Sequence, residues 1–245
     1  MTVRVDLAGP RRVLAIGAHP DDIEFGCGAT LAKWSDAGAE VHLCICTDGS
    51  KGTWDPEADL PTLVATREEE QRDAAKVLGA VDVHFLRRID GELVNDLAAR
   101  ADLCATIREV RPDVVLGHDP WQPYRLHPDH READLLVLGA IVAARDPHFF
   151  AEQGLAPHRP ATLLLFEPGR VDHLERVDRH VERKVDALLA HRSQWRSTMA
   201  IDEADPSRSA GQRAAFVEGL HVEAATTGLR AGLRAAEAFA RIDQL

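Results

Sequence analysis

Short, nearly continuous apolar runs alternate with longer amphipathic segments through the first two thirds of the chain. An uninterrupted apolar run is typical of a strand covered on both faces, whereas apolar residues at helical spacing indicate a helix with one buried side. The predicted strands are residues 13–16, 41–46, 83–86, 114–116 and 162–166. The predicted helices between them are residues 28–37, 67–78, 97–110 and 131–144.

This order of strands and helices predicts an α/β fold with a Rossmann-like, doubly wound and mostly parallel sheet that carries helices on both faces. We expect a single domain over residues 1–245, with a core at about 11–170 and a C-terminal helical segment at about 171–245. In that segment the apolar spacing predicts one long helix over 174–195, helical material over 213–219 and 227–242, and a polar, mobile loop over 200–212.

Composition and charge restrict the class of protein further. The 40 acidic and 29 basic side chains give a net charge of -11, which argues against nucleic acid or an anionic membrane surface as the main partner. The N-terminus lacks a secretory apolar segment, and no apolar run approaches the ~20 residues that span a bilayer. The four cysteines form no C-x-x-C pair, as in a reducing compartment. We therefore expect a soluble, cytoplasmic protein.

Polar clusters follow four of the five predicted strands. Residues 19–22 follow the first strand, 47–49 the second, 118–130 the fourth and 167–168 the fifth. Because the carboxyl ends of parallel strands meet at one edge of an open sheet, where ligands bind, these clusters are predicted to converge.

Two of the clusters carry the residue types of a metal centre. The first, Ala18-His19-Pro20-Asp21-Asp22, offers an imidazole and two adjacent carboxylates, of which one can bind a metal while the other faces the metal-bound water. The second is His127-Pro128-Asp129-His130; if a helix begins near its proline, the two imidazoles face the same volume. One can bind metal, and the other can act in proton transfer. Two histidines and one aspartate fit a catalytic zinc site with one open position.

The same residues could also have purely structural roles. The first cluster can be an exposed turn whose aspartate caps a helix, and the second a histidine-rich surface turn. Arg67 can be a solvated helix start or a substrate contact, and His118 a strand end or part of the pocket lining. His191 can be a packed or capping residue. The loop around Asp48 frames the pocket or is a plain loop, and it does not match a Walker phosphate-binding sequence.

Together, residues 18–22 and 127–130 resemble the zinc-dependent de-N-acetylase family, which includes the N-acetylglucosaminyl-phosphatidylinositol deacetylases and enzymes of mycothiol and bacillithiol metabolism. Weaker similarities are Thr47-Asp48-Gly49, Arg67-Glu68, His118-Asp119-Pro120, His191-Arg192-Ser193-Gln194 and Ala236-Glu237-Ala238-Phe239. The chain departs from many relatives in one position, because Ile23 separates the paired aspartates from Glu24.

The resemblance implies a role for each of these residues. His19, Asp22 and His130 would bind Zn²⁺ or another divalent metal. Asp21 would be the general base, and His127 would stabilise the oxyanion or protonate the leaving amine. Arg67, together with Asp48 and His118, is the candidate set for substrate binding.

The implied function is a hydrolase that removes an acetyl group from an N-acetylated amino sugar or its conjugate. Two alternatives are an amidase of a thiol–sugar conjugate and a metal- or nucleotide-binding module without catalysis, since a fold does not fix a function. The expected partner is the small amino-sugar substrate, and the apolar terminal helices suggest a homo-oligomer.

Overall fold

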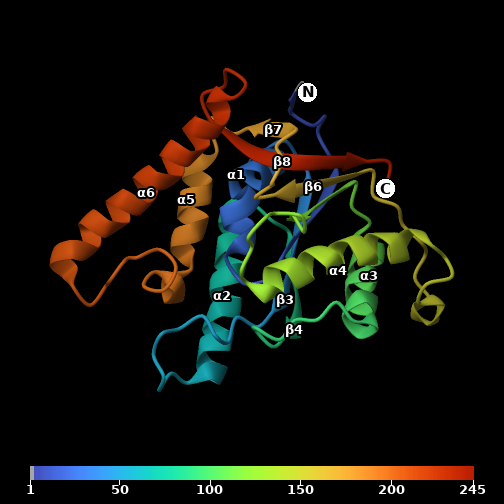
Figure 1. The fold of residues 1–245 in the computed structure, drawn as a ribbon, viewed down its shortest axis with the longest axis horizontal. Coiled ribbons are helices and arrows are strands. Elements are labelled where there is room, and N and C mark those ends of the chain that lie inside the picture. Colours follow the sequence, from blue (N-terminus) through green and yellow to red (C-terminus); the bar gives the residue numbers. More distant parts are fainter. Residues whose placement is uncertain (1–2) are drawn as a thin grey trace.

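A mixed sheet forms the centre of the molecule. The structure, a computed structural model, describes residues 3–245 and contains an eight-stranded sheet with the order β1-β7-β8-β6-β5-β2-β3-β4 (Figure 1). Neighbouring strands are parallel except that β8 runs antiparallel to both β6 and β7. The strands are β1 (Arg4–Val5), β2 (Arg12–Gly17), β3 (Glu40–Thr47), β4 (Asp82–Arg88), β5 (Val114–His118), β6 (Thr162–Phe166), β7 (His173–Arg176) and β8 (Ala236–Asp243).

Helices cover both faces of the sheet, so the predicted α/β fold class is confirmed. The helices are α1 (Asp22–Asp36), α2 (Leu60–Leu78), α3 (Leu97–Val110), α4 (Pro128–Arg145), α5 (Val181–Ala190) and α6 (Pro206–Leu229), with short 3₁₀ turns η1 (Ala151–Gln153) and η2 (Arg192–Gln194). The α3 and α4 helices pack on one face, whereas α1, α2 and α5 pack on the other (Figure 1). In the described part of the chain, no helix combines the length and apolar character needed to cross a membrane.

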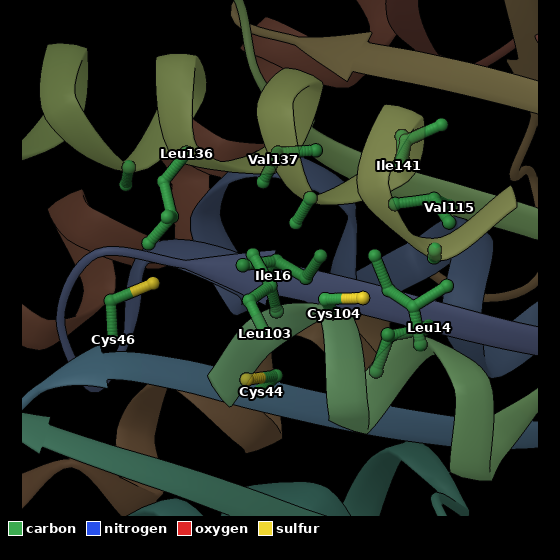
Figure 2. Packing of buried hydrophobic residues seen from close by; sticks show 14 of the residues in the cluster. Leu14, Ile16, Cys44, Cys46, Leu103, Cys104, Val115, Leu136, Val137 and Ile141 are labelled. Atoms are coloured by element: carbon green, nitrogen blue, oxygen red, sulfur yellow. The ribbon is translucent and has the colours of Figure 1, made fainter. Parts of the chain in front are cut away.

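The central strands have no polar face because they are covered on both sides. Leu14 and Ile16 of β2 point toward α3 and α4, where they meet Leu103 and Leu136 (Figure 2). The alternate residues of the same strand pack in the second core cluster with α1 and α2. Burial on both faces explains why these strands are near-continuous apolar runs in the sequence.

The expectation that residues 171–245 form a helical segment is wrong in two places. The long helix predicted over 174–195 does not begin at residue 174, because His173–Arg176 form β7 and α5 begins only at Val181. Residues 227–242, predicted as helical, contain the end of α6 and the strand β8. Gly232 has a φ of 68° in the turn between these two elements, a conformation that ends a helix. Pairing on both sides with β6 and β7 then outweighs the helical spacing of the apolar residues.

Two helices also begin earlier than predicted. The expected loop over residues 200–212 contains the start of α6, where Pro206 occupies the first turn as a helix-initiating proline does. The α2 helix begins at Leu60, so Arg67 lies inside this helix and does not open it.

The α1 helix consists of two parts separated by a break at Cys27. This residue has φ -151° and ψ 17°, outside helical values, and only the second part was predicted. The Lys184 ammonium donates to the Phe25 carbonyl oxygen at 2.6 Å, on one side of the break. On the other side, Glu237 accepts hydrogen bonds from two backbone N–H groups, those of Ala29 (3.2 Å) and Thr30 (2.8 Å). Lys184 and Glu237 form a buried ion pair at 2.8 Å, so α5 and β8 together satisfy the backbone groups that the break leaves free.

Candidate active site

The polar clusters predicted at the strand ends do meet at one edge of the sheet. His19 follows β2, Asp48 follows β3, His118 ends β5 and Glu167 follows β6. His127 and His130 come from the first turn of α4, which follows β5. The parallel order β3-β2-β5-β6 places these strands side by side, so their carboxyl ends form a continuous rim.

Two imidazoles and the two oxygens of one carboxylate in this rim are close enough to surround one metal ion. His19 Nδ1 lies 3.2 Å from His130 Nε2 and 3.3 Å from Asp22 Oδ2, and His130 Nε2 lies 3.3 Å from Asp22 Oδ1. Ligands bound tetrahedrally to zinc at about 2.0–2.1 Å are separated by roughly 3.3–3.4 Å. The spacing of the predicted ligand set His19, Asp22 and His130 therefore suits a zinc ion, with Asp22 offering either carboxylate oxygen.

The local backbone explains how both adjacent aspartates reach the site. Asp21 has a φ of 104°, a left-handed value that is rare for a residue with a side chain. Its backbone N–H is held by the side-chain oxygen of Gln71 at 3.1 Å. Asp22 begins α1 and accepts the backbone N–H of His19 at 2.7 Å. The turn separates the two carboxylates, so Asp22 faces the histidines while Asp21 faces Arg67.

Asp21 is buried beside the predicted metal ligands. Burial raises the pKa of Asp21 to about 6, and the Arg67 guanidinium, with Nη2 at 3.7 Å from Asp21 Oδ2, limits the rise. A carboxylate with this pKa is ionised at neutral pH and can accept a proton there. These properties suit the predicted general base.

His127 lies exposed at the N-terminus of α4, on the outer side of the cluster. Its ring centroid is 4.6 Å from that of His19 and 4.9 Å from that of His130. Partial burial and the two neighbouring imidazoles lower the pKa of His127, which favours the neutral ring. A neutral imidazole still donates one N–H to an oxyanion.

The residues predicted to bind substrate lie in the site, but their polar atoms contact protein groups. Arg67 is buried and donates to the carbonyl oxygens of Pro20 (2.6 Å) and Gly49 (2.8 Å). Asp48 accepts the backbone N–H groups of Ser50 (2.9 Å) and Asp90 (3.0 Å). Both residues thereby fix the loops around the site, and their direct contact with substrate stays a prediction.

His118 lies behind the predicted metal ligands. Its ring stacks on that of His130 with centroids 4.6 Å apart, and its Nε2 atom lies 3.3 Å from Asp22 Oδ2. Burial lowers the pKa of His118, but the Asp22 carboxylate opposes this effect and the net result is a rise to about 9. Because only 2% of the residue is exposed, its position suits support of Asp22, and a substrate contact stays a prediction.

Two carboxylates hold the far side of the His19 ring. His19 Nε2 lies 3.2 Å from Asp90 Oδ1 and 3.2 Å from Asp129 Oδ2. A histidine that binds metal through one nitrogen commonly donates its other N–H to a carboxylate, which fixes the ring. Asp129 belongs to the second histidine cluster of the sequence, whereas Asp90 was not among the candidate residues. Its signal was available, because Asp90 follows the third predicted strand at the same edge of the sheet.

A second network missed in the sequence lies behind Asp21. Glu24 and His191 are both fully buried, with His191 Nε2 at 3.5 Å from Glu24 Oε2. Gln71 joins this pair to Asp21, because its Nε2 donates to Glu24 Oε1 at 2.7 Å while its Oε1 accepts the Asp21 N–H. Glu24 therefore supports, through Gln71, the turn that carries the paired aspartates.

Comparisons with known proteins agree with this geometry. Residues 14–141 match the sequence model of the family described as GlcNAc-PI de-N-acetylase (PIG-L). A diacetylchitobiose deacetylase from Thermococcus kodakarensis is 36% identical over 188 residues, which cover 76% of this chain and 70% of that protein. A 1D-myo-inositol 2-acetamido-2-deoxy-alpha-D-glucopyranoside deacetylase from Streptomyces avermitilis is 35% identical, covering 59% of this chain and 57% of that protein.

A solved structure resembles nearly the whole chain. The N,N'-diacetylchitobiose deacetylase from Pyrococcus horikoshii, in complex with an inhibitor, superposes with a TM-score of 0.83 at 31% identity. The match covers 96% of this chain and 84% of that protein. The similarity therefore extends beyond the segment of the family model to the C-terminal elements.

Proposed function

Because the chain belongs to the GlcNAc-PI de-N-acetylase (PIG-L) family, we propose that it is a zinc-dependent hydrolase that removes the acetyl group from an N-acetylated amino sugar or its conjugate. One observation carries the proposal. The donor atoms of His19, Asp22 and His130 lie 3.2–3.3 Å apart beside a buried carboxylate, Asp21, that is ionised at neutral pH. This arrangement supplies both a metal site and a base.

The residues divide the work of amide hydrolysis. Zinc held by His19, Asp22 and His130 would supply Lewis acidity and favour deprotonation of water near pH ~7. Asp21 accepts the proton of the attacking water. The His127 N–H donates to the oxygen of the acetyl carbonyl as negative charge develops there; loss of one such donor typically costs ~10²–10³ in rate. The leaving amine then takes a proton, either the one that Asp21 accepted from water or one from His127 when its ring is protonated.

The supporting residues keep these groups in place. Asp90 and Asp129 hold His19, so that its Nδ1 faces the other ligands. Arg67 keeps Asp21 ionised and ties the Pro20 turn to the loop at Gly49. Arg67 remains the candidate for a sugar contact on the family pattern.

The Asp21→Asn substitution tests the assigned base. It should keep zinc bound while free-amine release from N-acetylglucosamine conjugates falls by about 10²–10⁴, the usual contribution of a general base. Zinc content measured by mass spectrometry and amine release are read on the same preparation. The control is Asp186→Asn, an exposed aspartate on α5, which should leave both unchanged. Full turnover by Asp21→Asn would contradict the role.

For the substrate we propose a short N-acetylglucosamine oligosaccharide, with diacetylchitobiose as the first compound to test. The support is the Thermococcus kodakarensis relative, whose match covers more of this chain than that of the inositol conjugate deacetylase. A panel of diacetylchitobiose, a GlcNAc–inositol conjugate and a thiol–sugar amide separates deacetylase from amidase. Zinc binding with no hydrolysis across the panel would favour a binding module without catalysis. The single domain, cytoplasmic location and homo-oligomer stay predictions.

A further inference from the structure

A second group of metal-ligating side chains lies outside the candidate active site. It consists of His42 on β3 and of Asp82 and His84 on β4. His42 is in register with Asp82, and Cys44 with His84, so that the three side chains share one face of this strand pair. One donor atom from each residue lies within 4.8 Å of the others.

The two imidazoles face each other. His42 Nδ1 and His84 Nε2 are 3.5 Å apart, and the rings are nearly parallel with centroids at 5.7 Å. His84 Nε2 also lies 3.8 Å from Asp82 Oδ2. These separations are slightly larger than the roughly 3.3–3.4 Å between ligands of a tetrahedral zinc ion, and a small rotation of the exposed Asp82 side chain would shorten the longer one. The Asp82 side chain is 63% exposed and that of His84 is 24% exposed.

This group is independent of the active site. His42 precedes Thr47, the end of β3 at the catalytic rim, by five residues, which corresponds to about 16 Å of strand. None of its three residues contacts His19, Asp22 or His130 in the interactions described above. A metal ion at one site can therefore be added or removed without changing ligands of the other.

The chemistry of the group selects a class of ion. Two imidazoles with one carboxylate suit zinc and neighbouring late first-row divalent ions, whereas calcium and magnesium need more oxygen ligands.

We propose that His42, Asp82 and His84 form a second divalent-metal site, separate from the catalytic one, that binds zinc or a similar ion and ties β4 to β3. A metal link at this position would hold an edge strand in the sheet. β4 is the last strand of the sheet and pairs only with β3 among the described strands. The same strand leads to Asp90, which holds His19, so a bridge at its amino end stabilises an element that supports the active site.

Zinc titration of the metal-stripped full-length protein tests the second site. The wild type should bind two equivalents, and His19→Ala/His130→Ala, which lacks the catalytic ligands, should bind one. His84→Gln and, separately, His42→Gln should also bind one, with unchanged amide hydrolysis once that equivalent is bound. Zinc should raise the Tm of His19→Ala/His130→Ala, but not that of the same variant carrying His84→Gln.

The control is His148→Ala. His148 is exposed and belongs to none of the possible metal-binding groups within residues 3–245, so this variant should still bind two equivalents of zinc. Circular dichroism in EDTA verifies that each variant is folded. The proposal is overturned if both glutamine variants bind as much zinc as the wild type, or if His19→Ala/His130→Ala binds none. These outcomes leave the proposed deacetylase activity untouched, since that activity is measured separately.

Discussion

At the scale of single residues, the site separates two adjacent aspartates into different roles. Burial raises the pKa of Asp21 to about 6. Burial acts in the same direction on Asp22, but His130 and His118 outweigh it and hold the pKa of Asp22 well below its usual range. Carboxylates whose environments move their pKa values apart typically divide into a proton acceptor and a permanently charged group. The left-handed turn at Asp21 makes this division possible.

The pH dependence of the activity should reflect Asp21. The base must be ionised to accept a proton, so kcat/KM should fall as the pH drops below about 6, and a bound cation moves this limb to lower pH. Because Arg67 favours the ionised form, Arg67→Met should move the limb upward by about one pH unit. Arg67→Lys, which keeps the charge, should move it less. Profiles of kcat/KM between pH 4 and 8 check this. An acidic limb in Arg67→Met at the same pH as in Arg67→Lys and the wild type would contradict it.

At the scale of secondary structure elements, the break in α1 couples the C-terminal part of the chain to the active site. The first part of α1 begins at Asp22 and is pressed against β6, where Gly26 lies against Phe166. The ring of Phe166 in turn lies 4.4 Å from that of His118. The Lys184–Glu237 pair supports the break from the other side. The α5 helix and the strand β8 therefore help to position Asp22, a predicted metal ligand at the start of α1.

Removing one partner of that ion pair should be costly. Lys184→Met leaves the Glu237 carboxylate buried without its cation, which typically destabilises a protein by ~3–5 kcal/mol. The double variant Lys184→Met/Glu237→Gln should regain part of this loss, because it removes the uncompensated charge and the amide oxygen still accepts one of the two N–H groups after the break. Urea unfolding measures both. Zinc affinity should also fall in Lys184→Met. Equal stability of that variant and the wild type would show that the Lys184–Glu237 pair does not stabilise the break in α1.

The contact between α1 and β6 gives a second prediction for this element. A Cβ atom at Gly26 would overlap the ring of Phe166, so Gly26→Ala should destabilise the protein by about 1–3 kcal/mol through overpacking and weaken zinc binding. Gly219→Ala on α6 is the matched control, because nothing lies within 4 Å of its Cβ position. It should be neutral or stabilising by up to ~1 kcal/mol, since alanine favours a helix. Thermal unfolding with and without zinc distinguishes the two.

At the scale of the whole molecule, ionisable side chains cluster at the carboxyl edge of the sheet, and one of them, Asp134, is buried away from water. Asp134 on α4 is fully buried, and neither of its carboxylate oxygens has a hydrogen-bond partner among residues 3–245. Burial raises the pKa of Asp134 from the ordinary 3.8 to about 7, although His118 and Arg125 oppose the rise. The folded chain therefore holds a proton there that the unfolded chain releases at a lower pH.

This difference predicts how stability varies with pH. As the pH rises from about 4 to 7, the unfolded state loses the Asp134 proton first, so the free energy of unfolding should fall and then level off. The Asp134→Asn variant lacks the titrating carboxyl group and therefore this loss of stability. Measured without metal, the variant should be more stable than the wild type by about 2–4 kcal/mol at pH 8, with little difference near pH 4. Urea unfolding at both values checks the sign, and a gain independent of pH would rule out this cause.

Most of the fold could be predicted because its central strands are buried on both sides. The runs that became β2, β3, β5 and β6 are apolar whatever lies beside them, and the α3 helix occupies its predicted residues. The expected parallel topology then predicted that His19, Asp22, His127 and His130 meet at one edge of the sheet. The prediction was wrong for β7 and β8, which were expected to be helical; β7 has a single apolar residue, and the apolar residues of β8 also recur at helical spacing.

The sequence by itself determined the sheet, the edge where ligands bind and the two histidine clusters, because buried strands and chain direction are written in local residue patterns. Only the tertiary structure decided that β8 enters the sheet antiparallel, that Asp90 holds His19, and that Glu24 and His191 support Asp21 from behind. These contacts join residues far apart in the chain. Their energy comes from burial and complementary charge, which exist only after the elements have packed together.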